Sequence, residues 1–438
     1  MGNLQVAVVS LGCDKNTIDS EIMLGILVQH GFAITTDPQE ADVIVVNTCC
    51  FIEDAQQESI DCILESAQYK TMGKCRSLVV AGCLAQRFSE ELSSEIPEVD
   101  GFLGTGQVSQ VVELINRTLE GKRVSYVGKP ALVEGPRIVS TPTHYAYLKI
   151  AEGCDHRCGF CVIPSVRGRF TSRPVERVLD EAKGLVAAGA KELILVAQDT
   201  SRYGMDLEGR PLLASLLHSL HEIEGLRWIR VLYTYPAQIN DELLTALRLP
   251  KVCRYLDLPL QHASPRVLRS MGRPVMDYRR LIASIREKVP GISLRTTFIV
   301  GYPTEEEEDF QQLLDFVQEA KIENLGVFQF SPQEGTKAAR LPQLPTQVVQ
   351  ERYAKIMEVQ QGIVDMLNEE LIGTVLPVMV DGPSMESNLV YQGRHEGQAP
   401  DIDGLVYLGV ESLPGTVVNV RITDAHAYDL VGEVLDFA

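Results

Sequence analysis

The N-terminal part of the chain alternates between continuous apolar runs and longer amphipathic stretches. Uninterrupted apolar runs predict strands buried on both faces of a sheet, and they lie at 4–10, 42–47 and 77–82. The stretches between them carry apolar residues at helical spacing and predict helices at 17–30 and 52–69. Strands that alternate with helices predict a doubly wound parallel sheet, which we expect to span residues 1–125.

A second alternating pattern follows. Strand signals lie at 147–152, 192–198, 228–234, 255–259, 293–300 and 324–330. Helical patterns separate them at 175–188, 212–224, 241–247, 278–288 and 305–319. Six βα units predict a partial (βα)6 barrel, open at one side, within residues 140–370. The acidic run that starts this last helix is typical of a capping box, with Thr304 at the N-cap and Glu307 at N3.

The C-terminal part has a different pattern. A long helical stretch at 347–371 leads into a region rich in Val and Gly, with short alternating runs such as 375–380 and 417–422. Such runs predict a small antiparallel β-barrel over residues 371–438.

Length and composition fit this three-part organisation. A chain of 438 residues is long enough for two or three domains. Its first residues lack the basic and apolar regions of a signal peptide, and no apolar stretch is long enough for a membrane helix. We therefore expect a cytoplasmic protein with no membrane partner. Ten cysteines in such a compartment favour metal ligation or redox chemistry over disulfides.

Charge narrows the choice of partner. The net charge is −19, and from Leu371 onward only Arg394 and Arg421 are basic. The acidic residues of this last segment are Asp381, Glu386, Glu396, Asp401, Asp403, Glu411, Asp424, Asp429, Glu433 and Asp436. Nucleic-acid binding depends on cations that neutralise phosphates, so the segment disfavours nucleic acid as a direct substrate. It fits either a solvated acidic surface or a docking surface for a basic macromolecule.

Three cysteines are close together after the first barrel strand. Cys154, Cys158 and Cys161 have the spacing C-x3-C-x2-C. Three thiolates at this spacing can hold three corners of a 4Fe–4S cluster and leave one iron open to a substrate or cofactor. A structural zinc site would need a fourth ligand, commonly in paired C-x2-C spacings. The run therefore predicts an iron–sulfur cluster that takes part in chemistry.

Three further cysteines share one position relative to the N-terminal strands. Cys13, Cys49 and Cys83 each follow the end of a predicted strand. The carboxyl ends of parallel strands meet at one edge of a sheet, so these thiols can converge on a second 4Fe–4S cluster with an open iron. The alternative for each is a small buried apolar residue. We interpret Cys62, Cys75 and Cys253 as structural. Cys50 is ambiguous because it adjoins Cys49, and we expect its side chain to leave the strand end in another direction.

The sequence resembles the radical S-adenosylmethionine (SAM) methylthiotransferases. The resemblance covers the whole chain, and it rests on the runs 11–16, 47–52, 147–154, 198–199 and 257–262. It implies an N-terminal cluster domain, a radical SAM barrel and a C-terminal TRAM-type barrel. Within the family, the sequence is most similar to the branch that modifies an aspartate of the small-subunit ribosomal protein S-twelve. The rival is the branch that methylthiolates adenosine in tRNA, which resembles it in cysteine layout.

The resemblance also implies roles for residues. Cys154, Cys158 and Cys161 would ligate the cluster that binds SAM, and Cys13, Cys49 and Cys83 an auxiliary cluster. Phe160 would pack near the adenine of SAM. Gln198, Gln261 and Arg295, at or near strand ends, would be SAM contacts, although ordinary polar residues also line barrels at such positions.

The implied chemistry is radical. A 5′-deoxyadenosyl radical would remove a β-hydrogen of the aspartate, sulfur would join the carbon at the auxiliary cluster, and a second SAM would supply the methyl group. The reductant would be an electron donor such as flavodoxin or ferredoxin. A two-cluster electron-transfer protein is a distant alternative. It would normally have a fourth cysteine for each cluster, and none is near either triplet.

Overall fold

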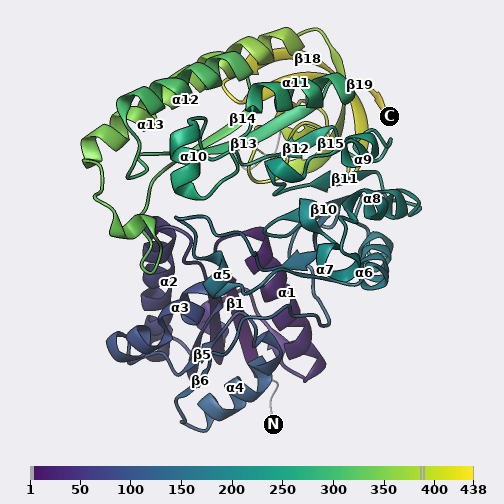
Figure 1. Ribbon diagram of the computed structural model, residues 1–438. Coiled ribbons are helices and arrows are strands. Elements are labelled where there is room, and N and C mark those ends of the chain that lie inside the picture. The colour runs from purple at the N-terminus through teal and green to yellow at the C-terminus, as the bar shows by residue number, and fades with distance from the viewer. Residues whose placement is uncertain (1–3, 385–386, 388–389, 438) are drawn as a thin grey trace. The chain divides into compact units, whose positions relative to one another are not determined.

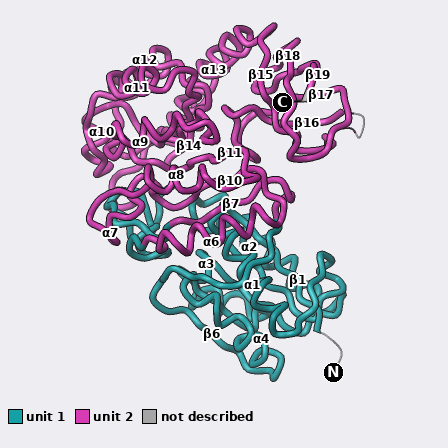
Figure 2. The backbone as a smooth tube through the Cα atoms, turned by 90° about the vertical axis from the view of Figure 1, so that its right-hand side faces the viewer, with its two compact units in different colours: residues 1–140, 151–171, 331–336 teal, residues 141–150, 172–330, 337–438 magenta. Residues whose placement is uncertain are grey.

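The computed structural model describes residues 4–384, 387 and 390–437. Glu386 of the acidic segment lies outside the described residues. The chain forms two compact units, shown in different colours in Figure 2. Unit 1 comprises residues 1–140, 151–171 and 331–336, and unit 2 comprises residues 141–150, 172–330 and 337–438. The segment with the C-x3-C-x2-C motif therefore belongs to the same unit as the N-terminal sheet.

Unit 1 is built on a six-stranded parallel sheet in the order β2-β1-β3-β4-β5-β6. The strands are β1 (Gln5–Ser10), β2 (Ala33–Ile34), β3 (Val43–Thr48), β4 (Ser77–Ala81), β5 (Gly101–Leu103) and β6 (Val124–Tyr126). The partners Ser10, Asn47 and Ala81 stand in register, so β1, β3 and β4 end at the same level. The predicted doubly wound sheet is confirmed.

Helices cover both faces of this sheet (Figure 1). They are α1 (Asp14–Gln29), α2 (Glu53–Met72), α3 (Gly82–Glu95) and α4 (Val111–Leu119). On one face Val46 and Val80 pack in a buried cluster with Ile63 of α2 and Leu84 of α3. Alternate strand residues point to opposite faces, and α1 packs with α4. The cysteine-bearing segment joins this core through Val166.

Unit 2 contains the six predicted barrel strands. They are β7 (Tyr145–Lys149), β10 (Glu192–Val196), β11 (Trp228–Val231), β12 (Tyr255–Asp257), β13 (Ser293–Val300) and β14 (Asn324–Gln329). They form two parallel three-stranded sheets, and a bridge between Ile229 and Val252 joins β11 to the segment before β12. The main helices between them are α6 (Val175–Ala187), α8 (Leu213–His221), α9 (Asp241–Ala246), α10 (Pro265–Met271), α11 (Tyr278–Lys288) and α12 (Glu307–Ala320). The partial (βα)6 barrel is confirmed.

The start of α12 corrects one expectation. The N-cap is Glu306 and N3 is Asp309, so the capping box lies two residues beyond the predicted Thr304–Glu307 pair. Glu305 is held in the preceding loop because its carboxylate accepts hydrogen bonds from the backbone N–H of Gly301 and from Arg352. These bonds keep the helix from starting earlier.

The long helix α13 (Thr346–Leu371) leads into a closed barrel in the order β15-β16-β17-β19-β18. Its strands are β15 (Val375–Pro383), β16 (Tyr391–His395), β17 (Val406–Leu408), β18 (Val417–His426) and β19 (Asp429–Phe437). Val378, Val418 and Ile422 fill its interior. The pairing is antiparallel as predicted, except that the short β17 runs parallel to β19.

Buried charges join this small barrel to the strands of the same unit. Glu192 of β10 accepts hydrogen bonds from Arg230 at 2.7 Å and from Arg394 at 2.8 Å. Arg394 also pairs with Asp381 at 2.8 Å, and Asp381 accepts from His144. Each buried charge in this network has a partner of opposite charge. A buried charge without such a partner would be strongly destabilising, because it has lost its hydration.

Candidate metal centre

The three N-terminal cysteines lie at the carboxyl edge of the unit 1 sheet. Cys13 is the N-cap of α1, Cys49 follows β3 directly, and Cys83 lies in the first turn of α3. Gly12 has a φ of +86°, and a Cβ at Gly12 would come within 2.7 Å of the Cβ of Cys49. The glycine thus allows the first cysteine-bearing turn to approach the second. Two of the thiols also lie at helix N-termini, where a thiolate is stabilised.

Cys50 is a fourth thiol in this region, and our expectation about its direction is wrong. Cys50 is 1% exposed and belongs to the same buried cluster as Cys83. It lies in the apolar core of unit 1, whereas the backbone of Cys49 is fixed by hydrogen bonds with the hydroxyl of Ser59. Cys50 is therefore a neighbour of the predicted ligands, on the side of the apolar core.

Sequence analysis missed a buried arginine at this edge. The Nε of Arg167 donates to the sulfur of Cys83 at 3.2 Å. Its terminal nitrogens donate to Asp19 at 2.5 Å, to Glu152 at 3.4 Å and to the side-chain oxygen of Asn16. Arg167 is 3% exposed. No periodic signal in the sequence could have identified this contact, since its partners are spread from residue 16 to residue 152.

The environment separates the pKa values of the thiols. Hydrogen bonding with Cys50 and the charge of Arg167 lower the pKa of Cys83 to about 6, despite its burial. Burial and the nearby Cys13 raise the pKa of Cys49 to about 11. A metal ligand must be a thiolate, so Cys83 is readily ionised for ligation, whereas Cys49 would lose its proton on binding iron.

The second triplet lies in the loop between β8 (Ala151–Glu152) and α5 (Ile163–Val166). The backbone N–H groups of His156 and Ile163 donate to the sulfurs of Cys154 and Cys161, both at 3.4 Å. The backbone N–H of Cys154 donates to the carbonyl of Gly168 at 3.1 Å and closes the base of the loop. Cys154, Cys158 and Cys161 are all partly exposed. N–H donors to cysteine sulfur are one of the means by which proteins tune iron–sulfur clusters.

The donor chemistry of both triplets suits iron–sulfur ligation, which stays a prediction for these six cysteines. Among the described residues, no group of three or more His, Cys, Asp or Glu side chains is placed to bind one metal ion. In a cubane each cysteine binds a different iron, so its ligands stand further apart than those around a single ion. Each triplet supplies sulfur donors, and each has backbone or guanidinium donors beside those sulfurs.

Two of the predicted SAM contacts, Gln198 and Gln261, lie near strand ends as expected. Gln198 follows β10, and Gln261 follows β12 with a φ of +74°. The backbone of Gln261 is fixed to β13 by hydrogen bonds to Thr297 and from Ile299, both at 2.8 Å. A non-glycine residue in this strained conformation is characteristic of functional sites. Both glutamines lie at carboxyl ends of barrel strands, where barrel enzymes bind substrates.

Arg295 requires a correction. It lies in the amino-terminal half of β13, away from the strand's carboxyl end, and its guanidinium pairs with Asp403 of the C-terminal barrel. Its expected position at a strand end is therefore wrong, and a contact with SAM stays untested. Phe160 is partly exposed in the cysteine loop, and its contact with adenine stays a prediction.

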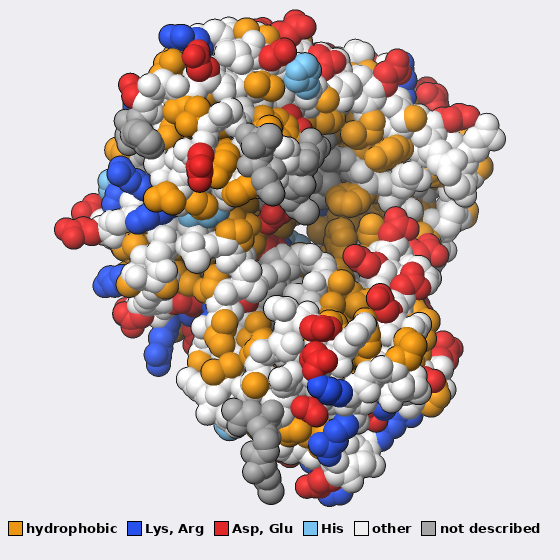
Figure 3. Space-filling model, turned by 180° about the vertical axis from the view of Figure 1, so that it is seen from behind, with side chains coloured by type: hydrophobic (Ala, Val, Ile, Leu, Met, Phe, Trp, Pro, Cys, Tyr) orange, Lys and Arg blue, Asp and Glu red, His pale blue; other side chains and the backbone are white. Residues whose placement is uncertain are grey.

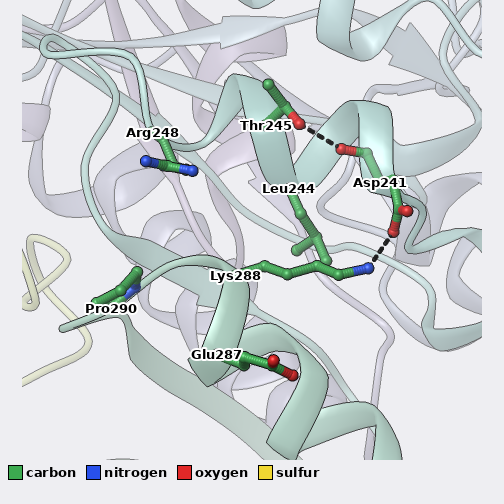
Figure 4. Close-up of a pocket in the computed structure, with 7 residues that line it drawn as sticks. All are labelled: Asp241, Leu244, Thr245, Arg248, Glu287, Lys288 and Pro290. Carbon is green, nitrogen blue, oxygen red and sulfur yellow. Dashed lines mark hydrogen bonds and ion pairs between the residues drawn. The ribbon is translucent and has the colours of Figure 1, made fainter.

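A surface cavity of unit 2 lies away from these residues. It has a volume of about 370 Å³ and is lined by Asp241, Leu244, Thr245, Arg248, Glu287, Lys288 and Pro290. Figure 4 shows Lys288 extended toward Asp241, with which it pairs. Lys288 ends α11, and the chain then enters β13, so this cavity is at the amino ends of the strands. Barrel active sites lie at the opposite ends.

Comparison with known proteins identifies the family. Family models match in three places: "Uncharacterized protein family UPF0004" at residues 5–104, the radical SAM superfamily at 148–317 and the TRAM domain at 372–435. Ribosomal protein uS12 methylthiotransferase RimO of Pelotomaculum thermopropionicum is 50% identical over 441 residues, which cover 99% of both chains. The protein of the same name from Geobacter sulfurreducens is 50% identical over 98% of both. The chain belongs to the uS12 methylthiotransferase family.

Solved structures agree on the fold. The radical SAM methyltransferase TsrM from Kitasatospora setae, with tryptophan and a SAM analogue bound, has a TM-score of 0.58 at 15% identity, covering 84% of this chain and 90% of that one. For a uS12 methylthiotransferase, the family confirms the predicted enzyme class and the predicted cofactors, 4Fe–4S clusters and SAM. The part of the chain that the structure describes has no helix able to span a membrane.

Proposed function

We propose that this chain methylthiolates the β-carbon of an aspartate of ribosomal protein uS12, with two 4Fe–4S clusters held by its two cysteine triplets. The auxiliary cluster would bind Cys13, Cys49 and Cys83, and the SAM cluster would bind Cys154, Cys158 and Cys161. The observation that carries this assignment is that both triplets belong to unit 1, where Arg167 joins Cys83 to the segment that holds the second triplet. A reaction that needs both clusters requires such proximity in the fold.

The bound cofactors supply the radical, the sulfur and the methyl group. The protein's residues bind and orient. The backbone N–H groups of His156 and Ile163 stabilise the thiolates of Cys154 and Cys161 by hydrogen bonds. Arg167 does the same for Cys83 and is itself held by Asp19. Gln198 and Gln261 are the side chains that we expect to orient SAM at the strand ends.

The partner follows from the family and from charge. Several acidic residues of the C-terminal barrel are exposed, and they include Glu411, Asp424, Glu433 and Asp436. On the face of the molecule shown in Figure 3, acidic and apolar side chains are interspersed. A ribosomal protein is basic, and its encounter with an acidic surface is accelerated by electrostatic attraction. The same surface would repel a tRNA backbone.

The electron donor is expected to be of the flavodoxin or ferredoxin type. The cysteine loop is partly exposed, and Arg157 and Arg169 beside it are exposed cations. Complementary charge favours encounter between such a loop and an acidic redox protein.

Release of 5′-deoxyadenosine tests the radical function. The anaerobically reconstituted enzyme should contain about eight irons and cleave SAM on reduction. The variant C154A/C158A/C161A should retain about four irons and release no 5′-deoxyadenosine. SAM cleavage by this variant would refute the assignment of the SAM cluster. Reduction without SAM cleavage in the wild type would favour the electron-transfer alternative.

A further inference from the structure

The strongest unassigned feature is the buried charge network at the sheet edge of unit 1. The guanidinium of Arg167 contacts four side chains: Asn16, Asp19, Cys83 and Glu152. All of these residues are buried. A desolvated cation with this number of partners has a fixed geometry, because any rotation would leave buried polar groups unpaired.

Arg167 occupies a defined place in the cysteine-bearing segment. It immediately precedes Gly168, whose carbonyl accepts the bond from Cys154 at the base of the loop. Glu152 lies two residues before Cys154, on the chain segment that enters the loop, whereas Arg167 lies on the segment that leaves it. Gly153 has a φ of +79°, and a Cβ there would come within 2.2 Å of the carbonyl oxygen of Arg169. The two ends of the loop are thus tightly joined, and the side chain of Arg167 at this junction reaches the sulfur of Cys83.

We propose that Arg167 is a positioning residue for the auxiliary cluster. Its guanidinium holds the Cys83 sulfur by a hydrogen bond and favours the reduced state of the cluster. This inference rests on the proposed ligation of that cluster by Cys83. A hydrogen bond to a cysteine sulfur and a nearby positive charge both stabilise added negative charge on a cluster, so both raise its reduction potential. Asn16 and Asp19 on α1 fix the guanidinium from the opposite side.

The test measures the reduction potential of the auxiliary cluster by itself. Full-length C154A/C158A/C161A is reconstituted, so that only the auxiliary site is loaded, and is titrated under EPR. Since Arg167→Gln alone leaves Asp19 uncompensated in a buried site, the informative comparison is R167Q/D19N against D19N. We expect the potential of R167Q/D19N to be more negative than that of D19N. R167K/D19N, which keeps the charge but loses the planar fork, should fall between D19N and R167Q/D19N.

A control changes another buried arginine of unit 1 that also pairs with α1. Arg137 pairs with Glu21 of α1, and neither side chain is more than 7% exposed. Arg137→Lys should leave the potential at the wild-type value. Equal potentials for D19N and R167Q/D19N, or an equal shift in R137K, would overturn the role of Arg167 while leaving the auxiliary cluster in place. A failure of C154A/C158A/C161A itself to hold a cluster would instead refute the proposed ligation, and the inference with it.

Discussion

Asp403 of the C-terminal barrel forms an ion pair with Arg295 of β13, and the Asp403 side chain is only 1% exposed. Its other carboxylate oxygen accepts a hydrogen bond from the hydroxyl of Tyr255 at 2.7 Å. Asp401 nearby accepts from the hydroxyls of Tyr145 and Tyr147. Both aspartates therefore join the barrel to the strands of unit 2. The Asp403 carboxylate is therefore buried in internal pairing and is not available for docking, whereas Asp401 is exposed and its part in docking stays a prediction.

Loss of this ion pair should destabilise the protein. Asp403→Asn leaves the partly buried Arg295 without a charged partner, which we expect to lower the free energy of unfolding by about 2–3 kcal/mol. Scanning calorimetry would show a lower Tm. The control is Glu433→Gln, because Glu433 and Arg421 are 4.0 Å apart and both well exposed. Equal Tm values for the two variants would contradict the structural role of Asp403.

The auxiliary ligands can be distinguished from their neighbour Cys50. Cys49→Ala should remove the auxiliary cluster and reduce iron from about eight to about four per chain. Cys50→Ala should keep both clusters, since the three proposed ligands remain and a buried cysteine behaves as a small apolar residue that alanine can replace. Iron analysis would measure the iron content of each variant, and EPR would show which clusters it retains. Cluster loss in Cys50→Ala, with retention in Cys49→Ala, would exchange their roles.

The sequence predicted the strands well because their apolar runs are continuous, and the cysteines because they recur after those runs. It could not predict contacts between polar residues far apart in the chain. Arg167 was missed for this reason. The acidic residues of the last segment could be counted, but their count does not reveal which of them, such as Asp403, are paired internally. Likewise, the acidic run before α12 offered several N-caps, and pairing of Glu305 with Arg352 decides among them.

Stability should fall in mild acid through His395. Burial and the nearby Arg230 lower the pKa of His395 to about 4, and its Nδ1 accepts a hydrogen bond from the backbone N–H of Gly397 at 3.1 Å. In the unfolded chain this histidine takes up its proton near its ordinary pKa. The stability that the neutral His395 contributes to the fold is therefore present above that ordinary pKa, and it is lost as pH falls toward 4. Between pH 7 and 5 the loss should be about 1–2 kcal/mol.

His395→Asn should reduce this pH dependence, because asparagine offers an acceptor without titrating. Unfolding free energies measured at pH 7 and pH 5 would show a smaller difference for this variant than for wild type. His426→Gln is the control, since His426 is well exposed. Identical pH dependence in wild type and His395→Asn would contradict the prediction.

Docking of uS12 should depend on the exposed acids of β18 and β19. The triple change D424N/E433Q/D436N should slow association with uS12 by about threefold to tenfold at low salt, and the difference should shrink as salt rises. Stopped-flow or surface binding would measure the rates. The control E58Q/D61N/E65Q removes three exposed acids from α2. An equal effect of both triple changes would indicate nonspecific attraction.

The modified molecule is either uS12 or tRNA. The most direct measurement places purified uS12 and bulk tRNA in one reaction with reconstituted enzyme, SAM, sulfide and a reductant, followed by mass spectrometry of the peptides and nucleosides. We predict that one aspartate of uS12 gains a methylthio group in place of a hydrogen while the tRNA is unchanged, and that C154A/C158A/C161A modifies neither. Methylthioadenosine in the tRNA, with uS12 unmodified, would contradict the account.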